Sequence, residues 1–190
     1  WNLTRFAETL IPLLHEEQDQ AIELAKKALA HYADEYLRHW FNGMRAKLGL
    51  FEEKSQDENL IKTLLAIMEK YQADYTNTFK ALTFERFDDM ELFESAEFRE
   101  WHNEWQKRLQ QEQKSASDVQ ALMKKHNPAV IPRNHRVAEA LEAAVEKEDY
   151  SLINQLLNVL SDPYAHTAEQ EEYATLPEPS HYPYITYCGT

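Results

Sequence analysis

The stretch EQDQAIELAKKALAHYADEYLRHWFN, residues 17 to 42, holds apolar side chains at three- and four-residue spacings and contains neither glycine nor proline. An α-helix turns once in about 3.6 residues, so this spacing places the apolar side chains on one face. The stretch predicts the longest helix of the chain, and Gly43 and Gly49 are its expected stops. The apolar face consists of Ile22, Ala25, Leu29, Tyr32, Tyr36 and Trp40.

The same periodicity recurs along most of the chain, and strict alternation of apolar and polar residues is nowhere sustained. Pro12 is expected to kink or end the first helix, while Asp74 and Ser95 are expected to cap two later ones. We therefore predict an all-α fold, with a helical bundle over residues 1–160 and an extended, Pro/Tyr-rich C-terminal strap over residues 161–190. Further helices are expected near residues 2–14, 55–71, 74–82, 95–113, 117–127, 134–147 and 149–160.

Composition and charge exclude several classes of protein. The chain has 190 residues, about one domain's worth, and a net charge of −13. Phosphate groups would be repelled over most of such a surface, so we expect neither a nucleic-acid partner nor an anionic membrane partner. The single cysteine, Cys188, cannot form a disulfide within the chain. Because the chain begins at Trp1, inside a helical pattern, we expect it to be a piece of something longer.

The stretch NPAVIPRNHRVAEAL, residues 127 to 141, concentrates turn-forming and basic residues in front of an apolar run. Its two prolines favour extended backbone, and Asn134 is the predicted N-cap of the helix that follows. That helix and the next, at residues 149–160, are expected to form a helical hairpin. Arg133 and Arg136 allow two interpretations: they pair with the acidic C-terminal segment or stay solvated, or they form a docking site for a phosphate or an upstream carboxylate.

No other pattern points to a self-contained active site. Glu35 and His39 share a helical face, but such a spacing is usually a surface pair, so no metal-ligating residue is assigned. Three glycines cannot supply a phosphate-binding loop, and no serine sits in a nucleophile elbow. Trp101 and Trp105 have the helical spacing of core or interface packing. From the residues alone, we expect no catalytic residue, no cofactor-binding residue and no metal site in this chain.

Several segments together resemble the C-terminal part of the selenoprotein O family (SelO), known in bacteria as YdiU. They are WNLTRFAETL (1–10), MRAKLGL (44–50), DYTNTFKAL (74–82), NPAVIPRNHRVAEAL (127–141) and PYITYCGT (183–190), in order along almost the whole chain. The resemblance implies the helical C-lobe and C-terminal extension of an atypical protein-kinase-like fold. It also implies transfer of AMP from ATP to serine, threonine or tyrosine hydroxyls of proteins, with ATP and Mg or Mn held by residues upstream of Trp1.

The expected role of this chain is then scaffold, substrate docking and redox control in a protein adenylyltransferase, and we expect the chain alone to be inactive. Its implied partners are the upstream kinase-like region and protein substrates, in the cytoplasm of a bacterium or the mitochondrion of a eukaryote. The resemblance also implies a cysteine or selenocysteine very near the C-terminus, which makes Cys188 the candidate for a redox role; the alternative for Cys188 is a buried hydrophobic anchor. The alternative for the whole chain is a stand-alone helical protein-interaction module without catalysis.

Overall fold

The computed structural model describes residues 1–88 and 90–177, and within these ranges the ordered elements are helices with no strand. The all-α prediction is confirmed for this part of the chain. In chain order the helices are α1 (Asn2–Leu14), α2 (Gln18–Lys47), α3 (Asp57–Lys70), α4 (Tyr75–Phe84), α5 (Glu91–Glu94), α6 (Ala96–Gln110), α7 (Ala116–His126), α8 (Asn134–Lys147), α9 (Ser151–Leu160) and α10 (Ala168–Tyr173).

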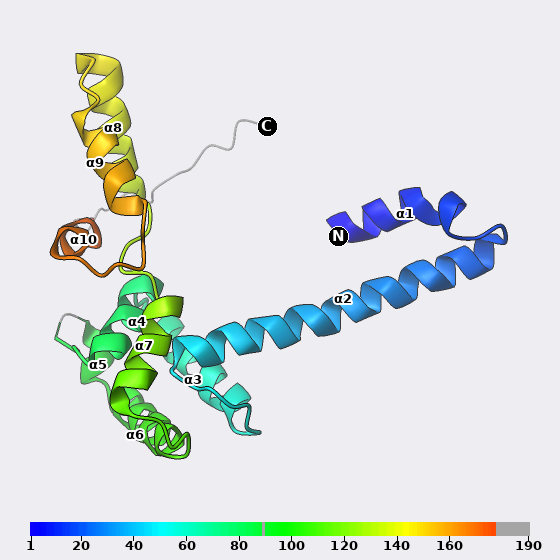
Figure 1. Cartoon of the computed structure of the whole chain (residues 1–190), viewed down its shortest axis with the longest axis horizontal. Coiled ribbons are helices and arrows are strands. Elements are labelled where there is room, and N and C mark those ends of the chain that lie inside the picture. Colours follow the sequence, from blue (N-terminus) through cyan, green and yellow to red (C-terminus); the bar gives the residue numbers. More distant parts are fainter. Residues whose placement is uncertain (89, 178–190) are drawn as a thin grey trace.

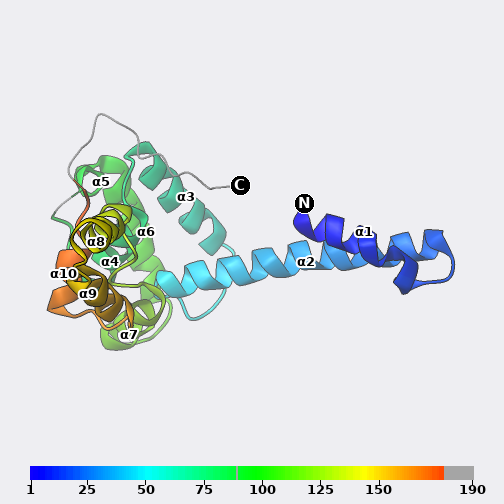
Figure 2. The same cartoon turned by 90° about the horizontal axis from the view of Figure 1, so that it is seen from above.

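The helices form a body with two projections (Figures 1 and 2). The body consists of α3 to α7 and the C-terminal end of α2. One projection, here called the arm, is formed by α1 and the rest of α2, with α1 folded back along α2. The other projection is the hairpin of α8 and α9, with α10 packed against α9 at its base. The predicted helical hairpin at residues 134–160 is therefore present.

The apolar core lies in the body. Trp101 and Trp105 of α6 are buried there, with stacked rings whose centroids lie 5.7 Å apart, as their spacing predicted. Each indole also donates a hydrogen bond across the core, from Trp101 Nε1 to the carbonyl of Leu60 at 2.8 Å and from Trp105 Nε1 to that of Leu48 at 2.9 Å. Buried indole N–H groups need such acceptors. These bonds tie α6 to α3 and to the end of α2.

The end of α2 differs from the prediction. Gly43 lies inside the helix, which continues to Lys47. Met44 and Arg45 are buried where α2 enters the body, and this burial outweighs the roughly 1 kcal/mol that an interior glycine costs a helix. Gly49 does follow the helix end, with a φ of 74°, a left-handed conformation that favours glycine.

Two predictions for the C-terminal third also need correction. Asn134 is the first residue of α8 and does not cap it: the N-cap is Arg133, without a capping hydrogen bond from a side chain. The segment after residue 160, expected to be extended, contains α10. A capping box opens this helix, because Thr167 Oγ1 accepts from the Gln170 N–H while Gln170 Oε1 accepts from the Thr167 N–H. The division of the chain at residue 160 stays a prediction.

Candidate functional site

Arg133 and Asp74 form a bidentate ion pair between the start of α8 and the start of α4. Arg133 donates from its two terminal nitrogens to the two carboxylate oxygens of Asp74, at 2.6 and 2.8 Å. The side chains are only 10% and 16% exposed. Asp74 also caps α4, as predicted, by accepting the N–H of Asn77 at 2.8 Å. One carboxylate therefore begins α4 and holds the α8–α9 hairpin against the body.

The electrostatics of Asp74 follow from these contacts. Burial by itself raises the pKa of a carboxyl group. The hydrogen bonds and positive charge of Arg133, together with the N–H of Asn77, outweigh that effect and lower the pKa of Asp74 below its usual value. Asp74 is therefore held ionised, and its partner is a structural arginine inside this chain.

Arg136, one turn later on α8, contacts the segment that contains α10. Its guanidinium lies over the ring of Tyr173, 5.5 Å from the centroid, and 3.4 Å from the hydroxyl of Thr175. Its ion pair with Glu139 is looser, at 3.6 Å. The sequence left two interpretations of Arg133 and Arg136 open: pairing with the acidic C-terminal segment or solvation, or a docking site. The structure instead places Arg133 on an internal carboxylate and Arg136 against α10, and a docking role for either residue stays a prediction.

A cavity of about 550 Å³ lies beside this ion pair. It is bounded by α4, by residues on either side of position 89, by α5 and by residues 171–176. Lys80 crosses it to Glu171 at 2.8 Å, and the Asn77 side chain donates to the carbonyl of Ala174 at 3.1 Å. The side-chain oxygen of Asn77 is buried without a hydrogen-bond partner among the described residues. Four charged side chains line the cavity together with apolar ones: Lys80, Arg86, Asp88 and Glu171.

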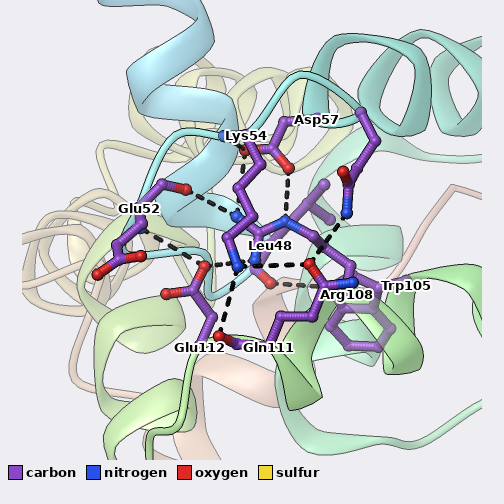
Figure 3. Close-up of polar contacts among 9 residues, drawn as sticks. Leu48, Glu52, Lys54, Asp57, Trp105, Arg108, Gln111 and Glu112 are labelled. Carbon is purple, nitrogen blue, oxygen red and sulfur yellow. Dashed lines mark hydrogen bonds and ion pairs between the residues drawn. The ribbon is translucent and has the colours of Figure 1, made fainter.

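A second polar cluster, which the sequence did not predict, is buried in the body around Arg108 (Figure 3). Arg108 donates to Asp57 at 2.6 Å, to Glu112 at 2.6 Å and to the carbonyl of Glu52 at 2.7 Å. The side chain of Arg108 is 2% exposed and both carboxylates are fully buried. Burial disfavours the charged guanidinium, but the two carboxylates outweigh it and raise the pKa of Arg108.

The Arg108 cluster fixes the loop between α2 and α3 to the end of α6. Asp57 contributes further by accepting the backbone N–H of Lys54 at 2.9 Å. Only the four-residue spacing of Arg108 and Glu112 is visible in the sequence, and that spacing is typical of an exposed helical pair. The cluster pairs its buried charges, although Glu112 Oε2 has no hydrogen-bond partner among the described residues, and its contribution is rigidity of the body.

The Glu35–His39 pair lies on the arm, apart from both clusters. His39 lies 3.6 Å from Glu35 on the exposed surface of α2. Across residues 1–88 and 90–177, no group of three or more His, Cys, Asp or Glu side chains has the arrangement of a metal site. None of the described helices is both long enough and apolar enough to span a bilayer. Cys188 lies outside the described residues.

Comparisons with known proteins give one consistent answer. The family model described as "Protein adenylyltransferase SelO" matches residues 1–161. The protein nucleotidyltransferase YdiU of Halalkalibacterium halodurans is 57% identical over 190 residues, which are 100% of this chain and 39% of that protein. The YdiU proteins of Alkaliphilus metalliredigens and Geobacillus kaustophilus are 57% and 58% identical with the same coverage. The chain thus spans about two fifths of the length of these curated relatives.

Proposed function

The chain belongs to the SelO family of protein adenylyltransferases, and from this premise we propose that it is the helical C-terminal region of a longer enzyme. That enzyme would transfer AMP from ATP to serine, threonine or tyrosine hydroxyls of proteins. The observation that carries the proposal is identity of 57% over the whole chain to a protein nucleotidyltransferase of which the chain covers 39%. The helices would form the C-lobe and C-terminal extension of an atypical kinase-like fold.

Among the described residues, no group of His, Cys, Asp or Glu side chains has the arrangement of a metal site, so no step of the transfer is assigned to this part of the chain. Three buried or partly buried carboxylates, Asp57, Asp74 and Glu112, are already paired with arginine. A net charge of −13 also opposes a triphosphate. We therefore place ATP and Mg or Mn in the polypeptide outside this chain, which would be the upstream partner of the arm and body.

The role we propose for this chain is to provide a rigid frame. Transfer of a phosphorus-containing group depends on positioning and on neutralising charge at a fixed geometry. The Arg108 cluster and the Trp101–Trp105 stack provide rigidity to the body, and the Arg133–Asp74 pair provides it to the α8–α9 hairpin. Arg133 then organises the lobe, while the more exposed Arg136 remains the candidate for docking a protein substrate.

Redox control through Cys188 and a cytoplasmic location are further parts of the proposal. The location is supported by bacterial relatives such as that of Halalkalibacterium halodurans. Redox control depends on the intact enzyme, because the only cysteine of this chain has no second thiol here to pair with.

A second candidate function is a helical interaction module without catalysis. It is favoured by the apolar side chains exposed on both projections, among them Leu13 and Tyr36 on the arm and Val145 and Leu157 on the hairpin. Exposed apolar patches commonly mark protein-binding surfaces.

The two candidates are separated by incubating the full-length protein with ATP labelled at the α-phosphate or at the γ-phosphate, with Mg or Mn, and a mixture of cellular proteins. Adenylyl transfer leaves the α-label on protein, whereas phosphoryl transfer leaves the γ-label. We expect metal-dependent retention of the α-label only. If a folded full-length protein leaves neither label on protein, the adenylyltransferase function is rejected and the interaction module remains.

A further inference from the structure

The arm carries an apolar surface that the described residues leave uncovered. None of the 13 residues of α1 is buried, although the helix is strongly apolar on one side. Between α1 and α2 lies an open groove of about 270 Å³ whose lining consists of Ala, Leu, Phe and Tyr side chains. Leu3, Phe6 and Leu10 line it from α1, and Leu24 and Leu29 line it from α2.

The uncovered surface continues along α2 past the end of the groove. Tyr32 and Tyr36 are 52% and 55% exposed, with ring centroids 6.3 Å apart. Trp40 follows one turn later and packs, partly buried, against the core of the body. The groove and these side chains form one continuous feature, here called the arm stripe. It contains the predicted apolar face of α2 except for Ile22, which does not line the groove.

The chemistry of α2 separates this stripe from the rest of the arm surface. Away from the stripe, Glu23 pairs with Lys26 at 2.9 Å, and Glu35 pairs with Arg38. Such helical pairs stay solvated and need no partner. A long helix with a bare apolar stripe gains little stability by itself, because most helical stability in proteins comes from packing an amphipathic face. We therefore expect another part of a protein to pack against the apolar stripe, but not against the charged face of α2.

The lengths of the relatives indicate what covers it. The family match begins at residue 1 and includes the whole arm, so the arm is part of the family's shared structure. The chain covers 39% of a relative that is 57% identical to it, which leaves most of that polypeptide outside the matched segment. This remaining polypeptide is tethered to the chain, so it docks without the entropic cost of bringing two molecules together.

We propose that the arm stripe is the docking surface for the remaining part of the same polypeptide, packed against α1 and against Tyr32 and Tyr36 of α2. The inference rests on the proposed function in one respect only, that this chain is a region of a longer enzyme. It assigns the arm an intramolecular role: the arm reaches out from the body and joins it to the part of the protein that would hold ATP.

Hydroxyl-radical footprinting of the unmodified full-length protein tests the proposal, with mass spectrometry reporting oxidation at each side chain. Tyr164, 45% exposed in the loop before α10, serves as the matched control for Tyr32, which is 52% exposed in the chain alone. If the stripe is covered, oxidation of Tyr32 relative to Tyr164 falls about sevenfold, the ratio of 52% exposure to the 7% of the buried ring of Phe93. Tyr36 falls in parallel.

The proposal is overturned if Tyr32 and Tyr164 are oxidised at similar rates. It is also overturned if protection of Tyr32 disappears on dilution together with a dimer in analytical ultracentrifugation, because a second copy would then be the cover. Introducing a charge into the stripe with Tyr36→Asp should restore oxidation of Tyr32, whereas Ala33→Asp on the same turn should not. Adenylyl transfer measured on the same preparation keeps the two proposals separate. If Tyr32 is protected but no AMP is transferred, the docking surface is supported and the adenylyltransferase function is rejected.

Discussion

Replacing Arg108 with methionine should destabilise the body more than any exposed charge substitution. Methionine keeps much of the apolar stem but removes the guanidinium. Asp57 and Glu112, whose side chains are both fully buried, then lose the only cationic partner that they have among the described residues, and the carbonyl of Glu52 loses a donor at 2.7 Å. The variant therefore leaves two buried carboxylates without compensation.

The expected magnitude follows from measured cases of this kind. Removing one partner of a buried ion pair costs about 3–5 kcal/mol, and here one substitution leaves two charges unpaired, so we expect the upper part of that range. Small domains are stable by only about 5–15 kcal/mol, so the loss is a large share of the total. The matched control is Lys107→Met on the same helix. Lys107 pairs with Glu104 at the surface, at 2.7 Å, and losing such a pair costs about 0–1 kcal/mol.

Urea unfolding followed by tryptophan fluorescence measures both variants. Trp105 is a suitable reporter because it lies one turn before Arg108, buried and stacked on Trp101. Adding Asp57→Asn and Glu112→Gln to Arg108→Met should recover part of the loss, because neutral side chains cost less to bury. If Arg108→Met shifts the unfolding midpoint no more than Lys107→Met, the cluster is not the rigid element that we describe.

The remaining predictions concern the arginines of α8, two helix caps and Cys188. Arg133→Met should cost about 2–4 kcal/mol and Arg136→Met under about 1 kcal/mol, and equal losses in urea unfolding would contradict the assignment of Arg133 as the structural arginine. Because the carboxyl partner of Arg133 has a lowered pKa in the fold, the contribution of the pair is present above its unfolded pKa near 4 and is lost as pH falls through the lower folded value, so wild type and Arg133→Met should converge in acid. Ser95→Ala, which removes a cap that accepts the N–H of Phe98 at 3.1 Å, should cost about 1 kcal/mol, whereas Asn134→Ala should stay within about 0.5 kcal/mol; the reverse order would restore Asn134 as a cap. In the full-length enzyme, oxidant should change AMP transfer of wild type but not of Cys188→Ser, and an identical response of the two would make Cys188 an anchor.

Local patterns in the sequence were sufficient to predict most of the helices. The stripe from Ile22 to Trp40 predicted α2, and Asp74 and Ser95 cap the helices that they were expected to cap. These features depend on residues three or four apart, where spacing and capping chemistry decide the outcome. The box formed by Thr167 and Gln170 is equally local, and it was a readable signal for α10.

Contacts between distant segments could not be predicted in the same way. Arg108 and Asp57 are 51 residues apart, and Arg133 and Asp74 are 59 apart, so neither ion pair leaves a pattern in the sequence. Neither interpretation of Arg133 from the sequence, pairing with the acidic C-terminal segment or solvation, or docking of an external anion, identified Asp74 as its partner. Gly43 read as a helix stop for the same reason, because the burial of the following residues that sustains the helix is a tertiary effect.

The central claim is that this chain provides a rigid structural frame for an enzyme whose ATP-binding site lies elsewhere in the polypeptide. It is tested most directly by comparing the 190-residue chain with the full-length protein in two assays, ATP binding by calorimetry and transfer of α-labelled AMP to protein with Mg or Mn. We expect the full-length protein to bind ATP and transfer AMP, and the chain alone, folded as judged by its helical circular dichroism, to do neither. Metal-dependent AMP transfer by the folded chain alone would contradict the account.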